Sequence, residues 1–470
     1  MTYKRAIILL VDGARFDTVY ALLQNGDLPA IHKYLAEAGS FFPAVTSFPS
    51  TTGPAYLPFI TGCLPATCNV PGIRWLDKVK FARRWISLER YRSYVGLETY
   101  LLNRDIRHDI ATIFELLPNA YSIFNSVNRG AGLFKNVTAV SRIWYWYYAH
   151  LTDRWGFVDD SSKAKLEDVV RKKDFDLVFA VFPSVDEYSH LGGPDVKEVK
   201  EGYRKVDKVV SDIMSILWDR GLHEETLIWI VSDHGLSATE VHFSVSNFLE
   251  QRGIKTFFYP KVFRRNCIAA DMVSGNGMTH VYFKHQNGWQ YPVYLDEIEK
   301  MYPTLISELI LEKAVDLLAV RKDERTVCVF SERGSAEIRL DGNYIDYEPL
   351  TSDPFGYSDI KGRFHVDELL SMTFESDYPD AIYELAHIFT SARCGDMVLS
   401  AKPGFDLRDI FEDPEHKGSH GSLHKSHMLV PIITNARLSA QFARTVDVFP
   451  TTLKLLGYPC PANIDGKALI

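Results

Sequence analysis

The chain has 470 residues, of which 46% are hydrophobic and 24% are charged, so it can build a sizeable core and wholesale disorder is excluded. The 52 Lys and Arg residues against 60 Asp and Glu residues give a formal charge of −8, which argues against a general nucleic-acid binder. The length indicates either several domains or one large α/β core with insertions.

The first expected element is a strand over Arg5–Val11, a continuous apolar run that suits a strand covered on both faces. The run ends at Asp12 without the small-residue cleavage site of a signal peptide, and no later stretch approaches the length of about 20 apolar residues that spans a bilayer. The six cysteines form no CxxC pair, so a disulfide framework is not expected. We therefore expect a cytoplasmic protein.

Further along the chain, apolar runs and helical periodicities alternate, each strand being followed by polar residues. The expected elements are a helix over 29–38, a strand over 176–181, a helix over 195–217, a strand over Thr226–Val231, a strand over 428–434 and a helix over 446–456. This alternation predicts an α/β fold with a doubly wound, mostly parallel sheet between helices. Ligands of such folds bind at the carboxyl ends of the strands.

Two stretches interrupt this rhythm. Residues 241–399 contain strand-like segments, and Asp341-Gly342 is a hairpin-turn signal. Residues 75–108 form a shorter charged and aromatic excursion. We therefore expect a catalytic core made of 1–240 and 400–470, with an inserted α+β lobe at 241–399 that covers the active edge and selects the substrate.

Carboxylates and imidazoles gather at the ends of the expected core strands. The candidates are Asp12, Asp186, His190, Asp233, His234 and His420. Each has an ordinary explanation when taken singly, such as a turn or a surface pair. Converging at one edge, however, the carboxylates would repel one another, and burying them unpaired is costly. Divalent cations would neutralise them, and mixed Asp and His ligands suit zinc, with manganese or iron as alternatives.

A second constellation is the hydroxyl-rich segment that ends at Thr52-Gly53-Pro54, which is compatible with a helix start. A hydroxyl at a helix N-terminus and on a metal ionises more easily and can act as a nucleophile. Thr51 is the rival candidate, and an N-cap without chemistry is the alternative interpretation.

Taken in order, these motifs resemble the alkaline phosphatase superfamily, and within it the type I phosphodiesterase/nucleotide pyrophosphatase family. The segments that carry the resemblance are Leu-Val-Asp12-Gly, Phe-Pro-Ser-Thr-Thr52, Thr61-Gly-Cys-Leu-Pro65, Asp186-Glu-Tyr-Ser-His190, Val-Ser-Asp233-His234-Gly and Gly-Ser-His420-Gly. They cover about 1–70, 175–240 and 400–470.

The resemblance implies two sites for divalent metals, most simply zinc. One would use Asp186, His190 and His420, and the other Asp12, Asp233 and His234 together with Thr52. Thr52 would attack phosphorus and form a phosphothreonine, which a metal-bound hydroxide would hydrolyse. The implied activity is that of a two-metal hydrolase of small-molecule phosphate esters, most simply a phosphodiesterase.

Members of this family often carry an Asn three residues after the nucleophile, where this chain has Ala55, so another group must hold the phosphoryl oxygen. Gly53 and Arg129 are our candidates for substrate binding, and Arg74 is a further arginine of interest. The aromatic run at 143–148 is either core, a crossing between lobes, or the wall of a pocket for an apolar or sugar group.

Several functions stay open at this point. A phosphomonoesterase, or a phosphoryl or phosphonate-type transferase, would use the same core. The absence of the family Asn is a reason to consider an inactive, metal-stabilised binding protein. A sulfatase is disfavoured because Thr52-Gly-Pro-Ala-Tyr56 lacks the Cys/Ser-x-Pro-x-Arg pattern. The sequence does not name the physiological substrate or the oligomeric state.

Overall fold

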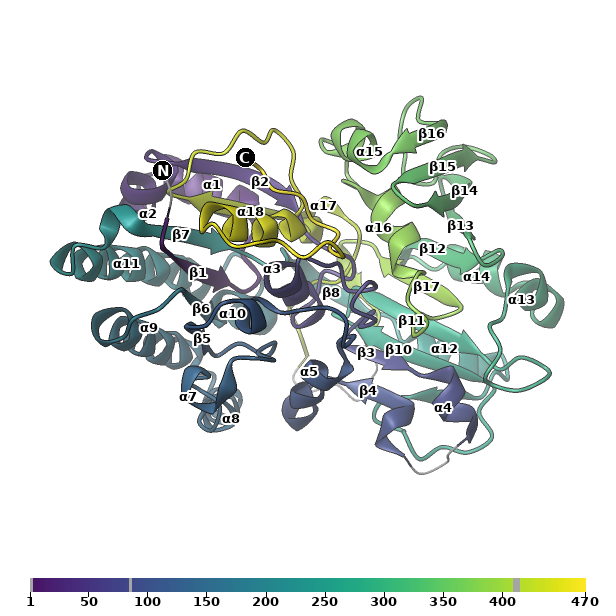
Figure 1. The fold of residues 1–470 in the computed structure, drawn as a ribbon. Helices are drawn as coiled ribbons and strands as arrows, with labels where there is room; N and C mark the ends of the chain where they lie inside the picture. The colour runs from purple at the N-terminus through teal and green to yellow at the C-terminus, as the bar shows by residue number, and fades with distance from the viewer. Residues whose placement is uncertain (1–2, 84–86, 409–414) are drawn as a thin grey trace.

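The computed structural model describes residues 3–83, 87–408 and 415–470 (Figure 1). Two large sheets organise this part of the chain, and each carries its own helices. Two small sheets join them: β8 (Ser237–His242), β18 (Gly404–Asp406) and β19 (Gly418–Ser419) form one, and β3 (Arg74–Leu76) and β4 (Tyr91–Ser93) form the other.

The first large sheet has six strands, and its central strands run parallel. In spatial order they are β2 (Ser40–Val45), β20 (Leu429–Thr434), β7 (Thr226–Val231), β1 (Arg5–Val11), β6 (Leu177–Phe182) and β5 (Ala120–Ile123). Strand β20 is antiparallel to both β7 and β2. The mostly parallel α/β fold predicted from the sequence is therefore confirmed, and the edge strands β2 and β5 are additions to it.

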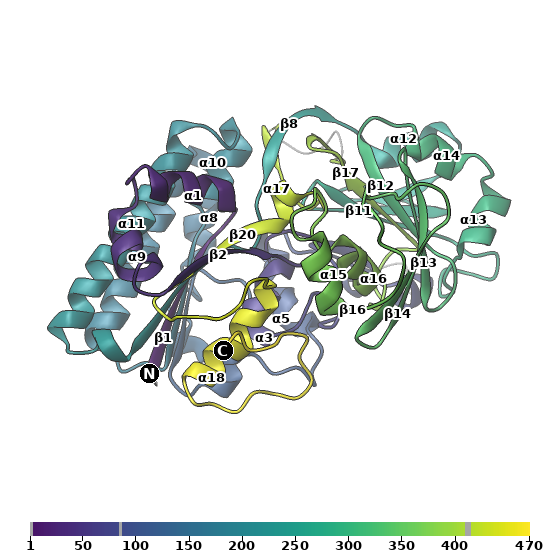
Figure 2. The ribbon, with the colours of Figure 1, turned by 90° about the horizontal axis from the view of Figure 1, so that it is seen from above.

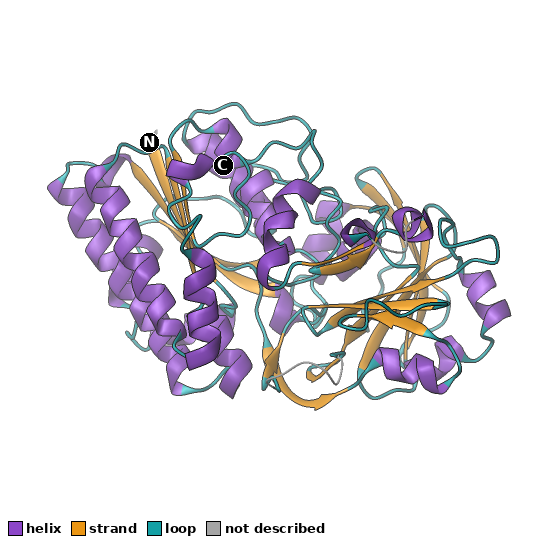
Figure 3. Cartoon of the chain, turned by 90° about the horizontal axis from the view of Figure 1, so that it is seen from below, coloured by secondary structure: helices purple, strands orange, loops and turns teal. Residues whose placement is uncertain are grey.

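Helices cover both faces of this sheet (Figures 2 and 3). One face carries α1 (Phe16–Gln24), α9 (Trp155–Lys172), α10 (Ser184–Gly192) and α11 (Lys197–Asp219), and the other carries α3 (Leu57–Thr61) and α18 (Val448–Leu455). The short helix α6 (Ile113–Leu116) contacts α3 and β5. The predicted helix 29–38 divides into α2 (Pro29–Ile31) and a π-helical segment, His32–Ala36.

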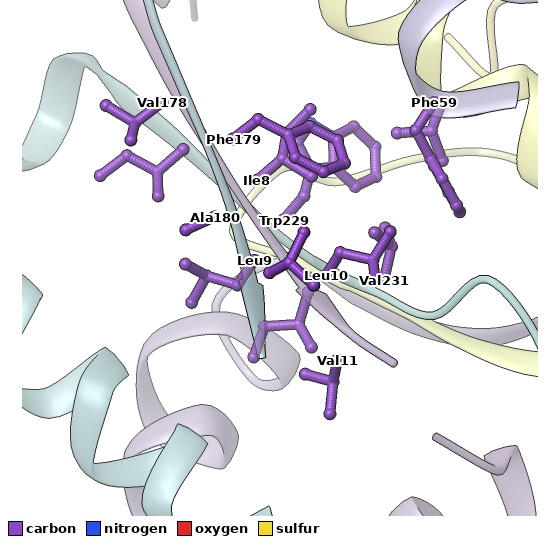
Figure 4. Close-up of a cluster of buried hydrophobic side chains, with 14 of the residues drawn as sticks. Ile8, Leu9, Leu10, Val11, Phe59, Val178, Phe179, Ala180, Trp229 and Val231 are labelled. Atoms are coloured by element: carbon purple, nitrogen blue, oxygen red, sulfur yellow. The ribbon is translucent and has the colours of Figure 1, made fainter. Parts of the chain in front are cut away.

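The core of this half is built from the strands themselves. Side chains of β1, β6 and β7 meet Phe59 of α3 in one apolar cluster (Figure 4). Every residue of β6 and β7 is buried, which accounts for their continuous apolarity. Burying both faces of these strands fixes their register, and therefore fixes where the polar residues after each strand emerge.

The second large sheet has nine strands, mostly antiparallel. In spatial order they are β16 (Gly362–His365), β15 (Tyr344–Pro349), β14 (Gly334–Asp341), β13 (Thr326–Ser331), β12 (Val315–Arg321), β17 (Met397–Ala401), β11 (Met278–Phe283), β10 (Ala269–Ser274) and β9 (Thr256–Phe258). The hairpin predicted at Asp341-Gly342 joins β14 to β15.

Alternate residues of this sheet face two different helical layers. Leu317 and Ala319 of β12 pack with one layer, whereas Leu318 and Val320 pack with the other. The first layer is α15 (Val366–Thr373) and α16 (Ala381–Ile388), and the second is α12 (Val245–Gln251), α13 (Leu295–Met301) and α14 (Leu305–Ile310). The division into a core and a lobe at 241–399 stays a prediction.

The excursion at 75–108 packs against the nine-stranded sheet through β3, which contacts β10. Its other elements include α4 (Lys78–Arg83), the 3₁₀ segment Gly96–Leu101 and α5 (Leu102–Asp105). Residues 84–86 of this excursion lie outside the described residues. The remaining helices are α7 (Gly132–Lys135), α8 (Arg142–Thr152) and α17 (Lys425–Met428).

Candidate active site

The polar residues that follow the parallel strands lie at one edge of the six-stranded sheet. Asp12 comes directly after β1, Asp186 lies in the first turn of α10 after β6, and Asp233 follows β7 after one intervening residue. The chain turns at Gly13 with φ of +72°, and a Cβ there would lie 2.8 Å from Cβ of Asp186. Glycine therefore permits both the turn and the close approach of the two acidic segments.

Three of the predicted ligands form one group around Asp186. Ligand atoms of Asp186, His190 and His420 all lie within 4.8 Å of one another. His190 Nε2 is 3.3 Å from Asp186 Oδ2, and His420 Nε2 is 3.9 Å from Asp186 Oδ1. The helical spacing of Asp186 and His190 on α10 places both on one face.

A second group shares Asp186 with the first. Ligand atoms of Asp12, Asp186 and His234 lie within 4.8 Å of one another. His234 Nε2 is 3.1 Å from Asp233 Oδ2 and 3.4 Å from Asp12 Oδ1. Asp186 therefore lies between the two groups, while Asp233 reaches the second group through His234. The sequence pattern assigned Asp186 to the first set alone.

The three imidazoles are oriented alike by backbone carbonyls. Nδ1 faces the carbonyl oxygen of Gly418 at 2.7 Å in His190, of Gly235 at 3.0 Å in His234 and of Ser50 at 3.0 Å in His420. An Nδ1–H that donates to each carbonyl leaves Nε2 with its lone pair directed at the carboxylates. This arrangement is typical of histidines that ligate metals.

The electrostatics of the edge call for a cation. Burial raises the pKa of Asp12 to about 7, with a further contribution from the Asp186 carboxylate. Burial, then the charges of Asp12 and Asp186, raise the pKa of Asp233 well above its usual range. Burial lowers the pKa of His234 to about 4, so this imidazole gives Asp12 and Asp233 no positive charge. His190 differs, because burial is outweighed by the Asp186 carboxylate, which raises the pKa of His190 to about 9.

Two buried carboxylate oxygens without hydrogen-bond partners also indicate a cation site. Asp186 Oδ1 and Asp233 Oδ2 are buried and have no hydrogen-bond partner. A buried carboxylate oxygen without a partner is costly, so native structures seldom keep one without a reason. The oxygen and nitrogen donors on these residues therefore fit divalent cations of the zinc type.

Thr52 lies at this edge as the sequence predicts. Its Oγ1 is 3.0 Å from His234 Nε2 and 3.2 Å from Asp12 Oδ1. The chain then turns at Gly53, with φ of +92°, into the 3₁₀ turn Pro54–Tyr56 and helix α3. The rival Thr51 is buried, and its Oγ1 has no hydrogen-bond partner.

The nine-stranded sheet also reaches the site. The hairpin between β10 and β11 carries Gly275, where a Cβ would lie 2.9 Å from Thr51 Cβ and 3.0 Å from His420 Nδ1. The amide of Gly277 donates to the carbonyl of His420 at 2.7 Å. The hairpin tip therefore fixes the backbone that presents His420.

A cavity of about 560 Å³ opens over Thr52. Its wall is aromatic and aliphatic and comes from the 3₁₀ segment Gly96–Leu101, from α5 and from α8. The lining residues used below are Thr52, Gly53, Arg74, Arg142, Trp146 and Tyr147. The aromatic run at 143–148 is thus part of a pocket wall, although Trp144 is 56% exposed.

The chain matches the family model "Type I phosphodiesterase / nucleotide pyrophosphatase" over residues 6–423. The chain belongs to this family. The resemblance to this family seen in the sequence is therefore confirmed.

Solved structures with the same fold cover nearly the whole chain. Mouse ectonucleotide pyrophosphatase/phosphodiesterase 5 aligns with a TM-score of 0.57 and 13% identity over 97% of this chain and 96% of that chain. Phosphonoacetate hydrolase from Sinorhizobium meliloti aligns with a TM-score of 0.58 and 14% identity over the same shares. At these identities the likeness shows the fold.

A curated relative is GPI ethanolamine phosphate transferase 3 of Schizosaccharomyces pombe, which is 23% identical over 248 residues. The match covers 50% of this chain but 23% of that protein, so the chain spans about a quarter of its relative's length. Within the described residues, every helix is too short or too polar to cross a membrane. The cytoplasmic location stays a prediction.

Ala55 occupies the position where the family pattern leads us to expect Asn. It is fully buried and its amide donates to the carbonyl of Thr51 at 2.9 Å. Its methyl group offers no hydrogen bond to a substrate. The neighbouring Gly53 lines the cavity, as expected for a residue that could approach the substrate.

Arg129 lies elsewhere and is a correction to the predicted substrate residues. It is not among the residues that line the cavity, and its Nε donates to Glu115 Oε1 at 3.1 Å. Its guanidinium also donates to the carbonyls of Ile106, Arg107 and Ile110. These contacts tie a loop to the end of α5, which is a structural role.

Two other residues line the cavity: Glu187, to which sequence reasoning gave no role, and His416, which it considered only as a rival of the nearby His420. The His416 ring lies 4.4 Å from the His190 ring, and its Nδ1 is 3.3 Å from Asn276 Nδ2. Glu187 follows Asp186 directly on α10. Adjacency to a predicted ligand was the available signal for Glu187, whereas His416 required the folded loop.

Proposed function

We propose that this protein hydrolyses small phosphate diesters in two steps through a phosphothreonine on Thr52. The observation that carries the proposal is the position of Thr52 Oγ1, 3.2 Å from Asp12 Oδ1 and 3.0 Å from His234 Nε2, at an edge where two buried carboxylate oxygens have no hydrogen-bond partner. Family membership supports phosphoester chemistry at this edge.

The proposed metal ligands are two sets of side chains. Asp186, His190 and His420 would hold one divalent cation, and Asp12, Asp233 and His234 the other, with Thr52 Oγ1 beside the second. Zinc suits this mixture of oxygen and nitrogen donors, and manganese or iron is the alternative. When bound, such cations stabilise negative charge on the attacking and leaving oxygens of a displacement at phosphorus.

The residues of the chain perform the remaining steps. Asp12 Oδ1 holds the proton of the Thr52 hydroxyl, whose oxygen forms the new bond to phosphorus as the bond to the leaving oxygen breaks. Tyr56 donates to Asp12 Oδ2 at 2.5 Å and keeps that carboxylate in place. Attack of water on the phosphothreonine then releases the phosphate product and restores Thr52.

A transferase is the second candidate, because one curated relative is named an ethanolamine phosphate transferase. A transferase would pass the phosphoryl group from Thr52 to an alcohol instead of to water. Product analysis with bis(4-nitrophenyl) phosphate in buffer with and without added ethanolamine or glycerol separates the two. Rates with 4-nitrophenyl phosphate then give the preference between mono- and diesters.

The decisive experiment is substitution of the nucleophile. Thr52→Ala should lower turnover of bis(4-nitrophenyl) phosphate at least about 1000-fold, since a covalent route then has no nucleophile. Acid quenching of the wild-type protein during turnover, followed by peptide mapping, should locate phosphate on Thr52.

The matched control is Thr304→Ala, an exposed threonine beside α14. This variant should turn over like the wild type. Phosphate mapped to Thr51, or full turnover by a folded, metal-loaded Thr52→Ala protein, would reject the assignment.

A further inference from the structure

Arg142 begins helix α8 and lines the same cavity as Thr52 and Gly53. The side chain is half-buried, and its Nε is buried without a hydrogen-bond partner. The guanidinium carbon lies 5.2 Å from the ring centre of Trp146, one turn along the helix. The aromatic ring supports the cation but cannot replace the hydrogen bonds that the guanidinium has lost.

No carboxylate in the described part of the chain forms an ion pair with Arg142. Burial lowers the pKa of Arg142, and the phenols Tyr56 and Tyr100 only partly oppose this shift. The other arginine of the cavity is engaged differently, since Arg74 Nε donates to Ser93 Oγ at 3.2 Å and its guanidinium stacks on Tyr259. A half-buried cation with a buried, unpartnered Nε at a cavity wall calls for an anion that enters the cavity.

The position of Arg142 relative to the nucleophile indicates which anion this is. Its charge acts on Tyr56, whose hydroxyl donates to Asp12 Oδ2 at 2.5 Å. The other oxygen of that carboxylate accepts from Thr52 Oγ1 at 3.2 Å. Arg142 and Thr52 therefore line one cavity, and the Asp12–Tyr56 pair holds the carboxylate beside Thr52.

We propose that Arg142 binds the non-bridging oxygens of the phosphoryl group that Thr52 attacks. This inference rests on the proposed function and assigns a donor where Ala55 supplies none. A guanidinium offers two parallel N–H donors that match two phosphoryl oxygens, and charge on those oxygens must be stabilised during transfer. The Trp146 ring lies against the guanidinium, 5.2 Å from its central carbon, and supports it.

The test compares three variants of Arg142 with a matched control. Arg142→Gln should lower kcat/KM for bis(4-nitrophenyl) phosphate about 100-fold, as loss of a preorganised donor does at other oxyanion sites. Arg142→Lys should recover only part of this loss, because an ammonium group lacks the two parallel N–H donors of a guanidinium. Arg154→Gln removes an exposed arginine just beyond α8 that does not line the cavity, and should behave as the wild type.

Two further measurements distinguish contact with substrate from a structural role. Added guanidinium chloride should partly restore the turnover of Arg142→Ala, and inorganic phosphate should inhibit Arg142→Gln about 10-fold more weakly than it inhibits the wild type. Metal content and Tm of each variant should match the wild type. Absence of rescue together with unchanged phosphate inhibition would assign Arg142 to packing and overturn the proposal.

A second substrate separates the scissile phosphoryl group from an anion on the leaving group. Diadenosine diphosphate carries one additional negative charge there. Equal losses on both substrates support the proposal, whereas a loss confined to the diphosphate would overturn it. If Arg142→Gln retains full activity while Thr52→Ala is inactive, this inference fails alone. If the metal-loaded wild type turns over neither substrate, the proposed function fails.

Discussion

Asp396 beside the nine-stranded sheet and Asp233 at the edge of the six-stranded sheet are both buried, but their surroundings differ. Asp396 accepts from Lys78 Nζ at 2.7 Å and from the amides of Phe283 and Val293. Asp233 has no lysine or arginine within ion-pair distance among the described residues, and its Oδ2 is without a hydrogen bond.

The same contrast holds for other pairs. Asp380 in the nine-stranded half accepts from Arg444 Nη2 at 2.8 Å, and Asp316 accepts from Arg333 at 2.9 Å. Asp12 instead faces a neutral imidazole, a threonine and a tyrosine. These carboxylates of the nine-stranded half are paired with lysine or arginine side chains, whereas those at the edge of the six-stranded sheet have no such partner among the residues that the structure describes. Buried carboxylates therefore mark a functional edge only where a cationic side chain is missing.

The largest expected effect comes from Asp186→Asn, which removes the carboxylate shared by the two ligand groups. Turnover of bis(4-nitrophenyl) phosphate should fall about 1000-fold, because charge stabilisation at the reacting oxygens is lost. Metal content measured by mass spectrometry should fall by at least one equivalent. A variant that kept both metals and full turnover would remove Asp186 from the site.

A smaller effect, on stability and not on metal content, is expected from Asp396→Asn. Breaking the buried pair leaves Lys78 without its partner, so the free energy of unfolding should fall by about 3 kcal/mol. Denaturant titration measures the change, and the folded protein should keep its metals. Loss of metal from this variant would contradict the separation of the two halves.

The smallest effect concerns a buried carboxyl group that neither pairs with a cationic side chain among the described residues nor belongs to the proposed metal ligands. Glu384 accepts from the amide of Phe48 at 2.8 Å, and its Oε1 has no partner. Burial, followed by the charge of Asp380, raises the pKa of Glu384 to about 8. The folded protein therefore keeps this proton where the unfolded chain has lost it, so stability falls as pH rises from about 4.5 to about 8.

Glu384→Gln should remove that contribution, so the Tm difference between variant and wild type should grow in favour of the variant as pH rises from 5 to 8. Thermal melts at several pH values check this expectation. A difference that is constant with pH would mean that Glu384 is ionised in the folded protein.

Local sequence signals located the edge of the site well. The apolar runs placed strand ends next to Asp12 and Asp233, because burial of all of β7 and of β1 beyond Arg5 leaves little freedom in where the strands stop. The predicted strands at 176–181 and 428–434 differ from β6 and β20 by one residue. Their positions follow from hydrophobic burial, which the sequence records directly.

The cavity wall could not be derived in the same way. In the sequence, Arg142 looks like an ordinary helix residue, and only the folded structure shows that it lines the cavity with Thr52. Arg129, which the sequence analysis chose as a substrate residue, pairs with Glu115 instead. Which guanidinium is left unpaired depends on contacts between segments far apart in the chain. Periodicity carries no information about such contacts.

The hairpin between β10 and β11 has a consequence for how such enzymes diversify. Its tip at Gly275 touches Thr51 and His420, and Gly277 holds the His420 carbonyl. A recombinant chimera that exchanged the whole segment 241–399 for a relative's would import a foreign support for His420, a proposed metal ligand. Exchange confined to the strands distant from that tip, β13 to β16, should leave the chemistry intact.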